Sequence, residues 1–228
     1  MKTLLSIDWD FFVPEDAKFD LGHSESLFFL DFIWQTRVNL IDKLQTNGEE
    51  IEFWSTLRPF ITDVSSVYVS DSHAYAHSLL QVLRNIDHII LVDAHHDCWK
   101  ADSLGIDKNI KQIYCHNWLR CWLKAKKTRR ATWIVPSWSD GCFILPTDMT
   151  SQVKVVSSMN NWEPCKVDQV HVCRSGCWTP PWLDGKFIDF ITESRMSPFK
   201  LQMNEWDPLV MRWSPDYLKK LQATKESS

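Results

Sequence analysis

One stretch, residues 89–97, constrains the fold of this chain more than any other. It reads Ile-Ile-Leu-Val-Asp-Ala-His-His-Asp, an apolar run that ends in two carboxylates and two imidazoles. Such a run is typical of a central strand covered on both faces, and open α/β sheets bind ligands at the carboxyl ends of their strands. Because Asp93, His95 and Asp97 alternate by two, their side chains point to one side. His96 faces away and is expected to pack or to support the site.

The size and composition of the chain favour one domain spanning residues 1–228. With 228 residues and 44% hydrophobic content it can build one sizeable core. The formal charge of −4 comes from mixed charges, so a nucleic-acid partner is not expected. No targeting segment follows Met1, and no apolar stretch approaches the ~20 residues that span a bilayer. We therefore expect a cytoplasmic protein without membrane contact.

Cysteine and tryptophan are the unusual part of the composition. Seven cysteines is an odd number, and the absence of a Cys-x-x-Cys pair favours free thiols in a reducing compartment. A zinc site could be imagined from Cys165, His171, Cys173 and Cys177. Their spacing matches no common zinc finger, so buried or partly buried thiols are favoured. Some of the thirteen tryptophans belong in the core, and others are suited to line a peptide groove.

A second pair of carboxylates follows the first apolar run of the chain. Residues 6–10 read Ser-Ile-Asp-Trp-Asp, which places Asp8 and Asp10 at the end of an expected strand. A solvated turn would rarely run straight on into Phe11, Phe12 and Val13. Buried carboxylates need a cation, and a metal ion supplies it.

His73 follows another expected strand, residues 66–69. A single histidine in such a place is usually structural. Here, however, a crossover helix is expected over residues 74–84, between this strand and the strand that ends at Asp93. A βαβ unit brings both strand ends to the same edge of a parallel sheet, so His73 becomes a candidate ligand.

The remaining pattern predicts a three-layer α/β/α fold with a mainly parallel sheet. A helix is expected over residues 24–44, with Ser24 as its N-cap and the Asn47-Gly48 pair after its end. A helix or strand is expected over residues 50–57. Further helices are expected over residues 114–126, 183–193 and 215–221, and further strands over residues 131–135, 153–156 and 167–173.

Two further segments are expected near the site, and a basic run is expected away from it. His116 could hold a proton donor over the metal site, although a solvent-facing histidine at a helix start is an equal alternative. Residues 174–182, Arg-Ser-Gly-Cys-Trp-Thr-Pro-Pro-Trp, follow a strand, and Arg174 and Trp178 are expected to contact substrate there. The basic run at residues 124–130 is interpreted as a solvated face.

The candidate ligands comprise four carboxylates and two imidazoles, with no thiolate: Asp8, Asp10, His73, Asp93, His95 and Asp97. A single zinc ion needs about four ligands, and sites rich in oxygen alone favour magnesium or calcium. Six mixed ligands suit two borderline-hard ions such as manganese. Two metals about 3.5–4 Å apart can hold a hydroxide nucleophile, so the expected chemistry is metal-assisted hydrolysis.

These motifs resemble those of the ureohydrolases, the arginases and agmatinases. Residues 93–97 resemble their Asp-Ala-His-x-Asp motif, residues 6–10 resemble their Ser-x-Asp-x-Asp motif, and His73 resembles the histidine of their Gly-Gly-Asp-His-Ser segment. The resemblance implies an arginase-like fold and two Mn²⁺ ions. Asp93 and Asp8 would bridge them, and Asp97 would also accept the hydroxide proton. His116 is similar in placement to the proton-shuttling histidine of the family. The implied ligands are His73, Asp93, Asp97 and Asp8 for one ion and His95, Asp93, Asp8 and Asp10 for the other.

Two departures from the family pattern point to an unusual substrate. The Ser-x-Asp-x-Asp motif comes first here, as in a circularly permuted chain, which a parallel sheet tolerates. Arg174 stands where the family has a glutamate that pairs with the guanidinium. The chain resembles most the peptide arginases, which implies conversion of arginine side chains in a precursor peptide into ornithine, with release of urea. Loose candidates for guanidinium recognition are Glu15, Asp16, Glu25 and Glu163.

Three other hypotheses remain open at this point. A deacetylase-like amide hydrolase would use a single zinc ion and would not require both Asp10 and His73. A ureohydrolase could instead act on a small free guanidino compound. A binding module without chemistry would be expected to have lost ligands, and none of the six is missing.

Overall fold

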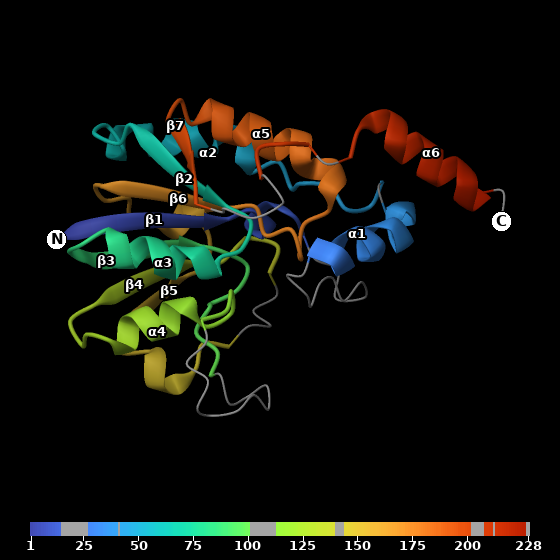
Figure 1. Ribbon diagram of the computed structural model, residues 1–228. Coiled ribbons are helices and arrows are strands. Elements are labelled where there is room, and N and C mark those ends of the chain that lie inside the picture. Colours follow the sequence, from blue (N-terminus) through green and yellow to red (C-terminus); the bar gives the residue numbers. More distant parts are fainter. Residues whose placement is uncertain are drawn as a thin grey trace.

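Two strands at the middle of a parallel sheet, β1 and β3, carry the carboxylate motifs. The computed structural model describes residues 1–14, 27–40, 42–100, 113–139, 144–201, 208–211 and 213–226. In these ranges one 7-stranded sheet has the order β5-β4-β3-β1-β6-β2-β7, and every strand pairs in parallel with its neighbours (Figure 1). The strands are β1 (Lys2–Asp8), β2 (Ser66–Ser70), β3 (Ile86–Val92), β4 (Arg130–Ile134), β5 (Val153–Val156), β6 (Gln169–Cys173) and β7 (Ser197–Lys200).

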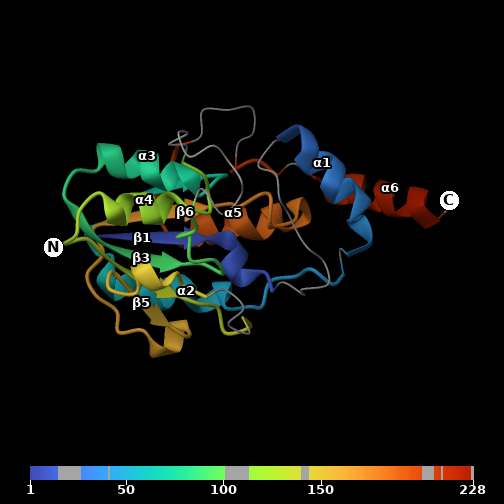
Figure 2. The ribbon, with the colours of Figure 1, turned by 90° about the horizontal axis from the view of Figure 1, so that it is seen from below.

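Helices cover both faces of this sheet, which confirms the predicted α/β fold of three layers. α3 and α4 pack on one face, and α2 and α5 pack on the other (Figures 1 and 2). The helices are α1 (Leu27–Thr36), α2 (Glu50–Leu57), α3 (Ala74–Val82), α4 (Trp118–Lys124), α5 (Asp184–Glu193) and α6 (Pro215–Glu226). Short 3₁₀ helices are η1 (Trp9–Phe12), η2 (Val38–Leu40), η3 (Arg58–Phe60), η5 (Thr147–Met149), η6 (Met159–Asn161) and η7 (Pro181–Leu183).

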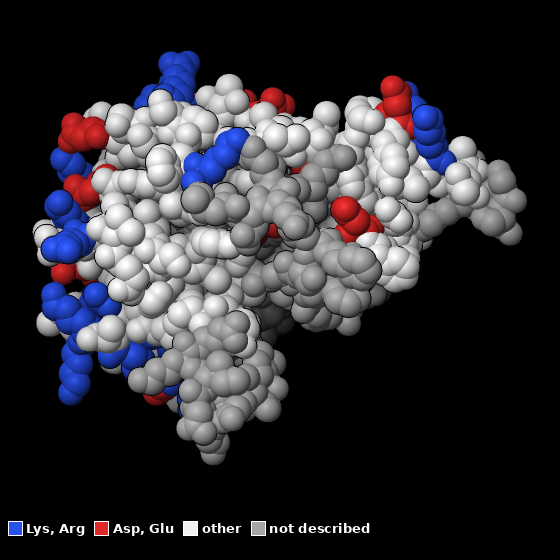
Figure 3. All heavy atoms as spheres, in the orientation of Figure 1, with Lys and Arg blue, Asp and Glu red and all other residues white. Residues whose placement is uncertain are grey.

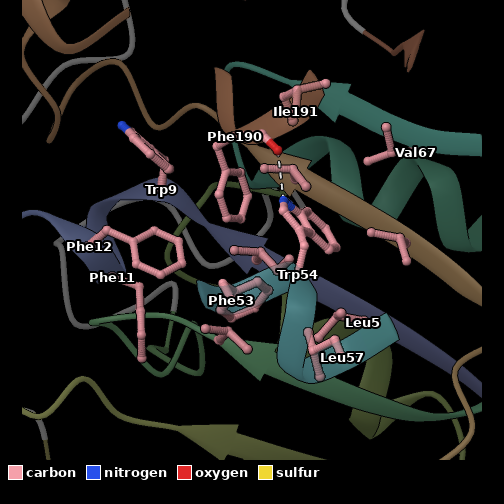
Figure 4. Close-up of a cluster of buried hydrophobic side chains, with 14 of the residues drawn as sticks. Leu5, Trp9, Phe11, Phe12, Phe53, Trp54, Leu57, Val67, Phe190 and Ile191 are labelled. Carbon is pink, nitrogen blue, oxygen red and sulfur yellow. Dashed lines mark hydrogen bonds between the residues drawn. The ribbon is translucent and has the colours of Figure 1, made fainter. Parts of the chain in front are cut away.

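The strand residues alternate between the two apolar cores. Leu5 and Ile7 of β1 face the core under α2 and α5, and Leu4 faces the core under α3 and α4. Several aromatic side chains pack together in the first core (Figure 4), where the indole nitrogen of Trp54 donates a hydrogen bond of 2.7 Å to the carbonyl of Phe190. Full burial of each large apolar side chain contributes about 1.5–3 kcal/mol, so burial on both faces fixes the register of the central strands.

The helix expected over residues 24–44 is shorter in the structure. α1 ends at Thr36 and gives way to η2, because Thr36 donates its hydroxyl to the Ile33 carbonyl at 2.6 Å and Arg37 bonds back to Trp34 in a 3₁₀ pattern. Ser24, the expected N-cap, lies outside the described residues.

Other boundaries also differ from the sequence-based expectation. The helix expected from residue 114 begins at Trp118, because Asn117 accepts the backbone N–H of Tyr114 and forms a turn before it. The last helix continues to Glu226, and β7 was not expected at all.

A third apolar cluster lies beyond the carboxyl ends of the strands, between α1 and α6 (Figure 1). Trp34 of α1 donates its indole N–H to the carbonyl of Gly176 at 3.0 Å, which ties the cluster to the turn after β6. A Cβ on Gly176 would lie 2.8 Å from Oδ1 of Asp71, so only glycine lets this turn approach the turn after β2. The cluster therefore borders the sheet edge at which β1 and β3 end.

Charged side chains gather at the opposite end of the sheet. Figure 3 shows many of the Lys and Arg side chains at the end of the molecule where the strands begin. Lys126 of the basic run is exposed there and pairs with Asp87 at 3.6 Å, as expected of a solvated face. Among the helices described, none is both long and apolar enough to span a bilayer.

Candidate metal centre

The candidate ligands come from the carboxyl ends of three strands. β1 and β3 are neighbours with Ile7 opposite Val92, so Asp8 and Asp93 follow side by side. β2 ends at Ser70, and the turn after it places His73 at the start of α3. The parallel sheet thus brings residues that are far apart in the sequence to one edge, as the strand pattern indicated.

Three carboxylate oxygens surround one nitrogen of His73. Its Nδ1 lies 3.1 Å from Oδ2 of Asp8, 3.0 Å from Oδ2 of Asp93 and 3.0 Å from Oδ2 of Asp97. All four side chains are buried. Within the described ranges, neither Nδ1 of His73 nor Oδ2 of Asp93 has a hydrogen-bond partner of acceptable geometry. A single N–H could not satisfy three carboxylates, so this group fits a divalent cation better than a hydrogen-bonded ion pair.

A second group forms around His95. Its Nδ1 lies 2.9 Å from Oδ2 of Asp10 and 3.6 Å from Oδ1 of Asp93. The His95 side chain is 13% exposed, the largest exposed fraction among the six candidate ligands. Among the described residues, the cluster is therefore most open to solvent at His95.

Asp93 belongs to both groups. The ligand atoms form two sets, and within each set they lie within 4.8 Å of one another: one set is Asp8, His73 and Asp93, and the other is Asp10, Asp93 and His95. Oδ2 of Asp93 faces His73, and Oδ1 faces His95 and accepts the backbone N–H of His95 at 2.7 Å. A carboxylate that offers one oxygen to each of two ligand sets has the arrangement expected of a ligand that bridges two ions.

Burial and mutual repulsion shift the pKa values of this cluster. Burial raises the pKa of Asp97 to about 7, helped by the charge of Asp93. Burial alone would lower the pKa of His73, but its contacts with the carboxylates raise that pKa well above the ordinary value. Burial would raise the pKa of Asp93, but its close contacts with the imidazoles of His73 and His95 lower it to about 2. The cluster therefore has a strong demand for positive charge, which protons or metal ions can meet.

The backbone at Asp97 is held in an uncommon conformation. Its φ is 48°, in the left-handed region that non-glycine residues rarely adopt, although Asp is among the more tolerant. Trp118 donates its indole N–H to Oδ2 of Asp97, which turns the carboxylate towards His73. Such local strain is typical of functional sites, where the surrounding structure holds a residue in place.

His96 lies apart from the ligand sets. Its ring packs on Trp99 and Trp133, and its Nδ1 accepts the backbone N–H of Cys98 at 2.9 Å. Burial lowers the pKa of His96 to about 4, so the ring is neutral. The structure places it as a packing residue, as the alternation of the motif indicated.

His116 lies near this motif, on the segment that leads into α4. Its carbonyl accepts the backbone N–H of Trp99 at 3.1 Å, and its ring stacks on Tyr114 with an interplanar angle of 9°. Burial lowers the pKa of His116. Its role as a proton donor stays a prediction.

Arg174 occupies the interior instead of a substrate surface. Its side chain has 0% exposure. Its Nε donates to Asp184 at 2.6 Å, and its Nη atoms donate to the carbonyls of Thr179 at 3.1 Å and Pro180 at 3.0 Å. These contacts hold the turn between β6 and α5, and they give Arg174 a structural position that a peptide could not reach.

The other substrate candidates have different surroundings. Trp178 lies beside the second ligand set, with its ring centroid 4.7 Å from that of His95, and it is half-buried. Glu163 is exposed on the segment after η6. Glu15, Asp16 and Glu25 lie outside the described residues. Trp178 is thus the substrate candidate that the structure brings next to the ligands.

The imagined cysteine-histidine zinc site does not form. His171 bonds to hydroxyls of Ser6 and Ser70, and the thiol of Cys173 accepts the backbone N–H of Ser175 at 3.3 Å and donates to the carbonyl of Asp71 at 3.5 Å. Within the described ranges, both groups that could hold a metal are sets of Asp and His. The roles of His171 and Trp118 were not predicted from the sequence. The position of Ser6 offered one signal, because it lies two residues before Asp8 and therefore on the same side of β1.

Comparisons of the chain with protein-family models, curated proteins and solved structures find no match. The fold and the site together define an α/β protein with a parallel sheet and a buried Asp/His cluster that could bind metal, compatible with a metal hydrolase.

Proposed function

We propose that this chain is a binuclear manganese hydrolase that converts arginine side chains of a precursor peptide into ornithine and releases urea. The observation that carries the proposal is the position of Asp93, whose Oδ2 faces His73 and whose Oδ1 faces His95. A single-zinc amide hydrolase has no need of a carboxylate shared between two ligand sets. The motif resemblance to ureohydrolases supplies the proposed reaction.

The donor atoms suit two manganese ions. The set around His73 offers one imidazole nitrogen and oxygens of Asp8, Asp93 and Asp97. The set around His95 offers one imidazole nitrogen and oxygens of Asp10 and Asp93. Mixed nitrogen and carboxylate ligands without thiolate favour borderline-hard divalent ions. When bound, two such ions supply Lewis acidity and lower the pKa of water to near neutrality.

Guanidinium hydrolysis needs groups that move a proton from water to the departing nitrogen. One water is consumed, a C–O bond forms at the guanidinium carbon, the C–N bond to the side chain breaks, and the departing nitrogen takes a proton. Asp97, whose Oδ2 lies 3.0 Å from Nδ1 of His73 in the ligand cluster, is the candidate to accept a proton from that water. His116, on the neighbouring segment, is the candidate for proton delivery to the departing amine.

The surroundings of His95 support a peptide substrate. Trp178 packs on the ring of His95 and also borders the apolar cluster of α1 and α6. An indole beside the more exposed ligand set offers a large contact area and a favourable face for a guanidinium cation. Arg174 is buried with Asp184, so the glutamate-based recognition of free arginine has no counterpart at this position.

Mass spectrometry tests the proposal directly. The full chain is incubated with Mn²⁺ and a set of arginine-containing peptides, and each modified arginine must lose one CH₂N₂ unit. Free arginine is tested in parallel: turnover of free arginine but not of peptides would refute the peptide substrate and leave a ureohydrolase. Counting bound metal separates this proposal from the deacetylase-like alternative, which needs a single zinc ion.

A further inference from the structure

A buried histidine outside both ligand sets, His171 of β6, forms part of a hydrogen-bonded chain that ends at His73. Ser6 of β1 lies opposite His171 in the sheet register. Its hydroxyl oxygen lies 2.8 Å from Nε2 of His73 and 2.9 Å from Nδ1 of His171. Nε2 of His171 lies 2.9 Å from the hydroxyl of Ser70. All four side chains are buried, so water does not compete for these bonds.

One backbone carbonyl fixes the direction of every bond in this chain. Ser70 donates its single hydroxyl proton to the carbonyl of Ser72 at 3.0 Å. It must therefore accept from Nε2–H of His171, which in its neutral form leaves Nδ1 as an acceptor. The Ser6 hydroxyl donates to that Nδ1 and in turn accepts from Nε2–H of His73. The nitrogen of His73 left with a lone pair is then Nδ1, the atom that faces Asp8, Asp93 and Asp97.

The surroundings of His171 keep the ring neutral, as this direction requires. The ring is fully buried, and its two nitrogens bond to the hydroxyls of Ser6 and Ser70, so no carboxylate is bonded to it that would stabilise a positive charge. A cationic His171 would donate from Nδ1 and would reverse the chain, placing a hydrogen on Nδ1 of His73 where a metal ligand needs a lone pair.

We propose that His171 is a positioning residue that sets the tautomer and orientation of His73 through Ser6, so that Nδ1 of His73 is presented to the metal. The inference rests on the proposed metal centre and adds a residue to it that does not touch metal or substrate. Partners that orient a metal-binding histidine typically contribute about 10–100-fold in metal affinity.

Nuclear magnetic resonance of the unaltered full chain tests the direction of the hydrogen bonds. The ¹⁵N-histidine-labelled protein is loaded with Zn²⁺, which is diamagnetic, and long-range ¹H–¹⁵N spectra assign the tautomer of each ring. We expect hydrogen on Nε2 of both His171 and His73. Hydrogen on Nδ1 of His171 would overturn the proposal.

Variants test the effect on metal affinity. His171→Phe keeps the ring shape and removes both nitrogens, and it should weaken Mn²⁺ binding about 10–100-fold in titrations followed by electron paramagnetic resonance. His171→Asn, which can still accept from Ser6, should restore most of the affinity. The matched control is His88→Phe, since His88 bonds to Thr132 on β4 and takes no part in the hydrogen bonds that link His171, Ser6 and His73. Equal affinity in His171→Phe and the unaltered protein would overturn the positioning role.

The outcomes separate this inference from the proposed function. If the unaltered chain binds no Mn²⁺, the metal centre fails and the positioning role fails with it. If the unaltered chain binds Mn²⁺ and His171→Phe binds it equally, the positioning role alone fails. Circular dichroism checks that each variant is folded. If His171→Phe does not fold, Ser6→Ala breaks the same chain and is expected to cause the same loss of affinity.

Discussion

Oδ2 of Asp93 lies 3.0 Å from Nδ1 of His73, and neither atom has a hydrogen-bond partner in the described part of the chain. Both side chains are buried, so the two atoms meet without water. Buried polar atoms are rarely left in this way unless they serve a ligand. The same carboxylate offers its other oxygen to His95, which makes Asp93 the centre of the proposed binuclear site.

Replacing Asp93 by Asn tests this central position. The amide keeps the size of the side chain but removes its charge and replaces one of its two oxygens by an NH₂ group. Bound Mn²⁺ should fall from two ions per chain to one or none, measured by elemental analysis after dialysis. The control is Asp87→Asn on β3, the strand that precedes Asp93; the exposed carboxylate of Asp87 pairs with Lys126. An unchanged metal content in Asp93→Asn would contradict the bridging role.

Metal removal should make the stability of the fold depend on pH in a definite direction. Burial raises the pKa of Asp97 to about 7, with a further contribution from the charge of Asp93. In the unfolded chain this pKa is about 4, so the folded chain binds the proton more tightly. The resulting stabilisation is complete at low pH and is lost as the pH rises from about 4 through about 7.

His73 acts in the same direction at higher pH. Its carboxylate contacts raise its pKa well above the ordinary value, so its contribution declines only above about pH 6.5. The melting temperature of EDTA-treated protein should fall between about pH 6.5 and about pH 8, where the unfolded histidines are already neutral. Mn²⁺ should raise it more at the higher pH, because metal and protons compete for the same ligands. A melting temperature that rises over this range without metal would count against the cluster.

The positions of the ligands could be predicted from the sequence because local rules determine them. Alternation by two separates Asp93, His95 and Asp97 from His96, and the structure shows this separation although β3 already ends at Val92. An apolar run before each polar motif placed Asp8 and Asp93 at strand ends, and parallel pairing brings such ends to one edge. These inferences needed no knowledge of the strand order.

The supporting residues could not be predicted because their partners depend on the strand order. His171 bonds to Ser6 and Ser70, which lie 165 and 101 residues away in the sequence. In the sequence it is a single polar residue in an apolar strand, close to cysteines that suggested a zinc site. Arg174 was expected to bind substrate. Its pairing with Asp184 could not be predicted, because it depends on how η7 turns the chain into α5.

Replacing Arg174 should lower stability and not alter substrate recognition directly. Arg174→Ala would leave Asp184 buried without a cation, at a cost of about 3–5 kcal/mol in the free energy of unfolding. The double variant Arg174→Met with Asp184→Leu should recover much of this loss, because an apolar pair can replace a buried ion pair. Urea denaturation measures both.

A surface ion pair provides the comparison for Arg174. Lys166 and Asp63 lie 2.6 Å apart, with side chains 65% and 69% exposed, so Lys166→Ala should change stability far less. If Arg174→Ala kept full stability but lost peptide binding, the structural role of Arg174 would be wrong and the substrate role would stand.

Replacing Trp178 should weaken the binding of the peptide and leave the binding of metal unchanged. Truncation to Ala removes the indole that packs on His95, and loss of a central aromatic contact typically costs more than 1 kcal/mol, a rise of about fivefold or more in KM. Mn²⁺ content should stay unchanged. Phe199→Ala is the control, since this aromatic residue is 58% exposed on the edge strand β7. A rise in KM of equal size in both variants would argue against a specific role for Trp178.

Asp97 has three roles in the proposed site: its backbone forms the strained turn, its carboxylate is a candidate metal ligand, and the same carboxylate is the proposed proton acceptor. Asp97→Ala should abolish turnover, and Asp97→Asn, which can still accept from Trp118, should lower it at least about 10²-fold because the amide cannot take up a proton. Neither variant should unfold the chain, because a buried carboxyl whose pKa is raised to about 7 contributes no stability in its charged form. Ornithine formation by mass spectrometry and melting temperature at about pH 8 measure the two effects. Full activity in Asp97→Ala would refute the assignment of this carboxylate to the metal centre.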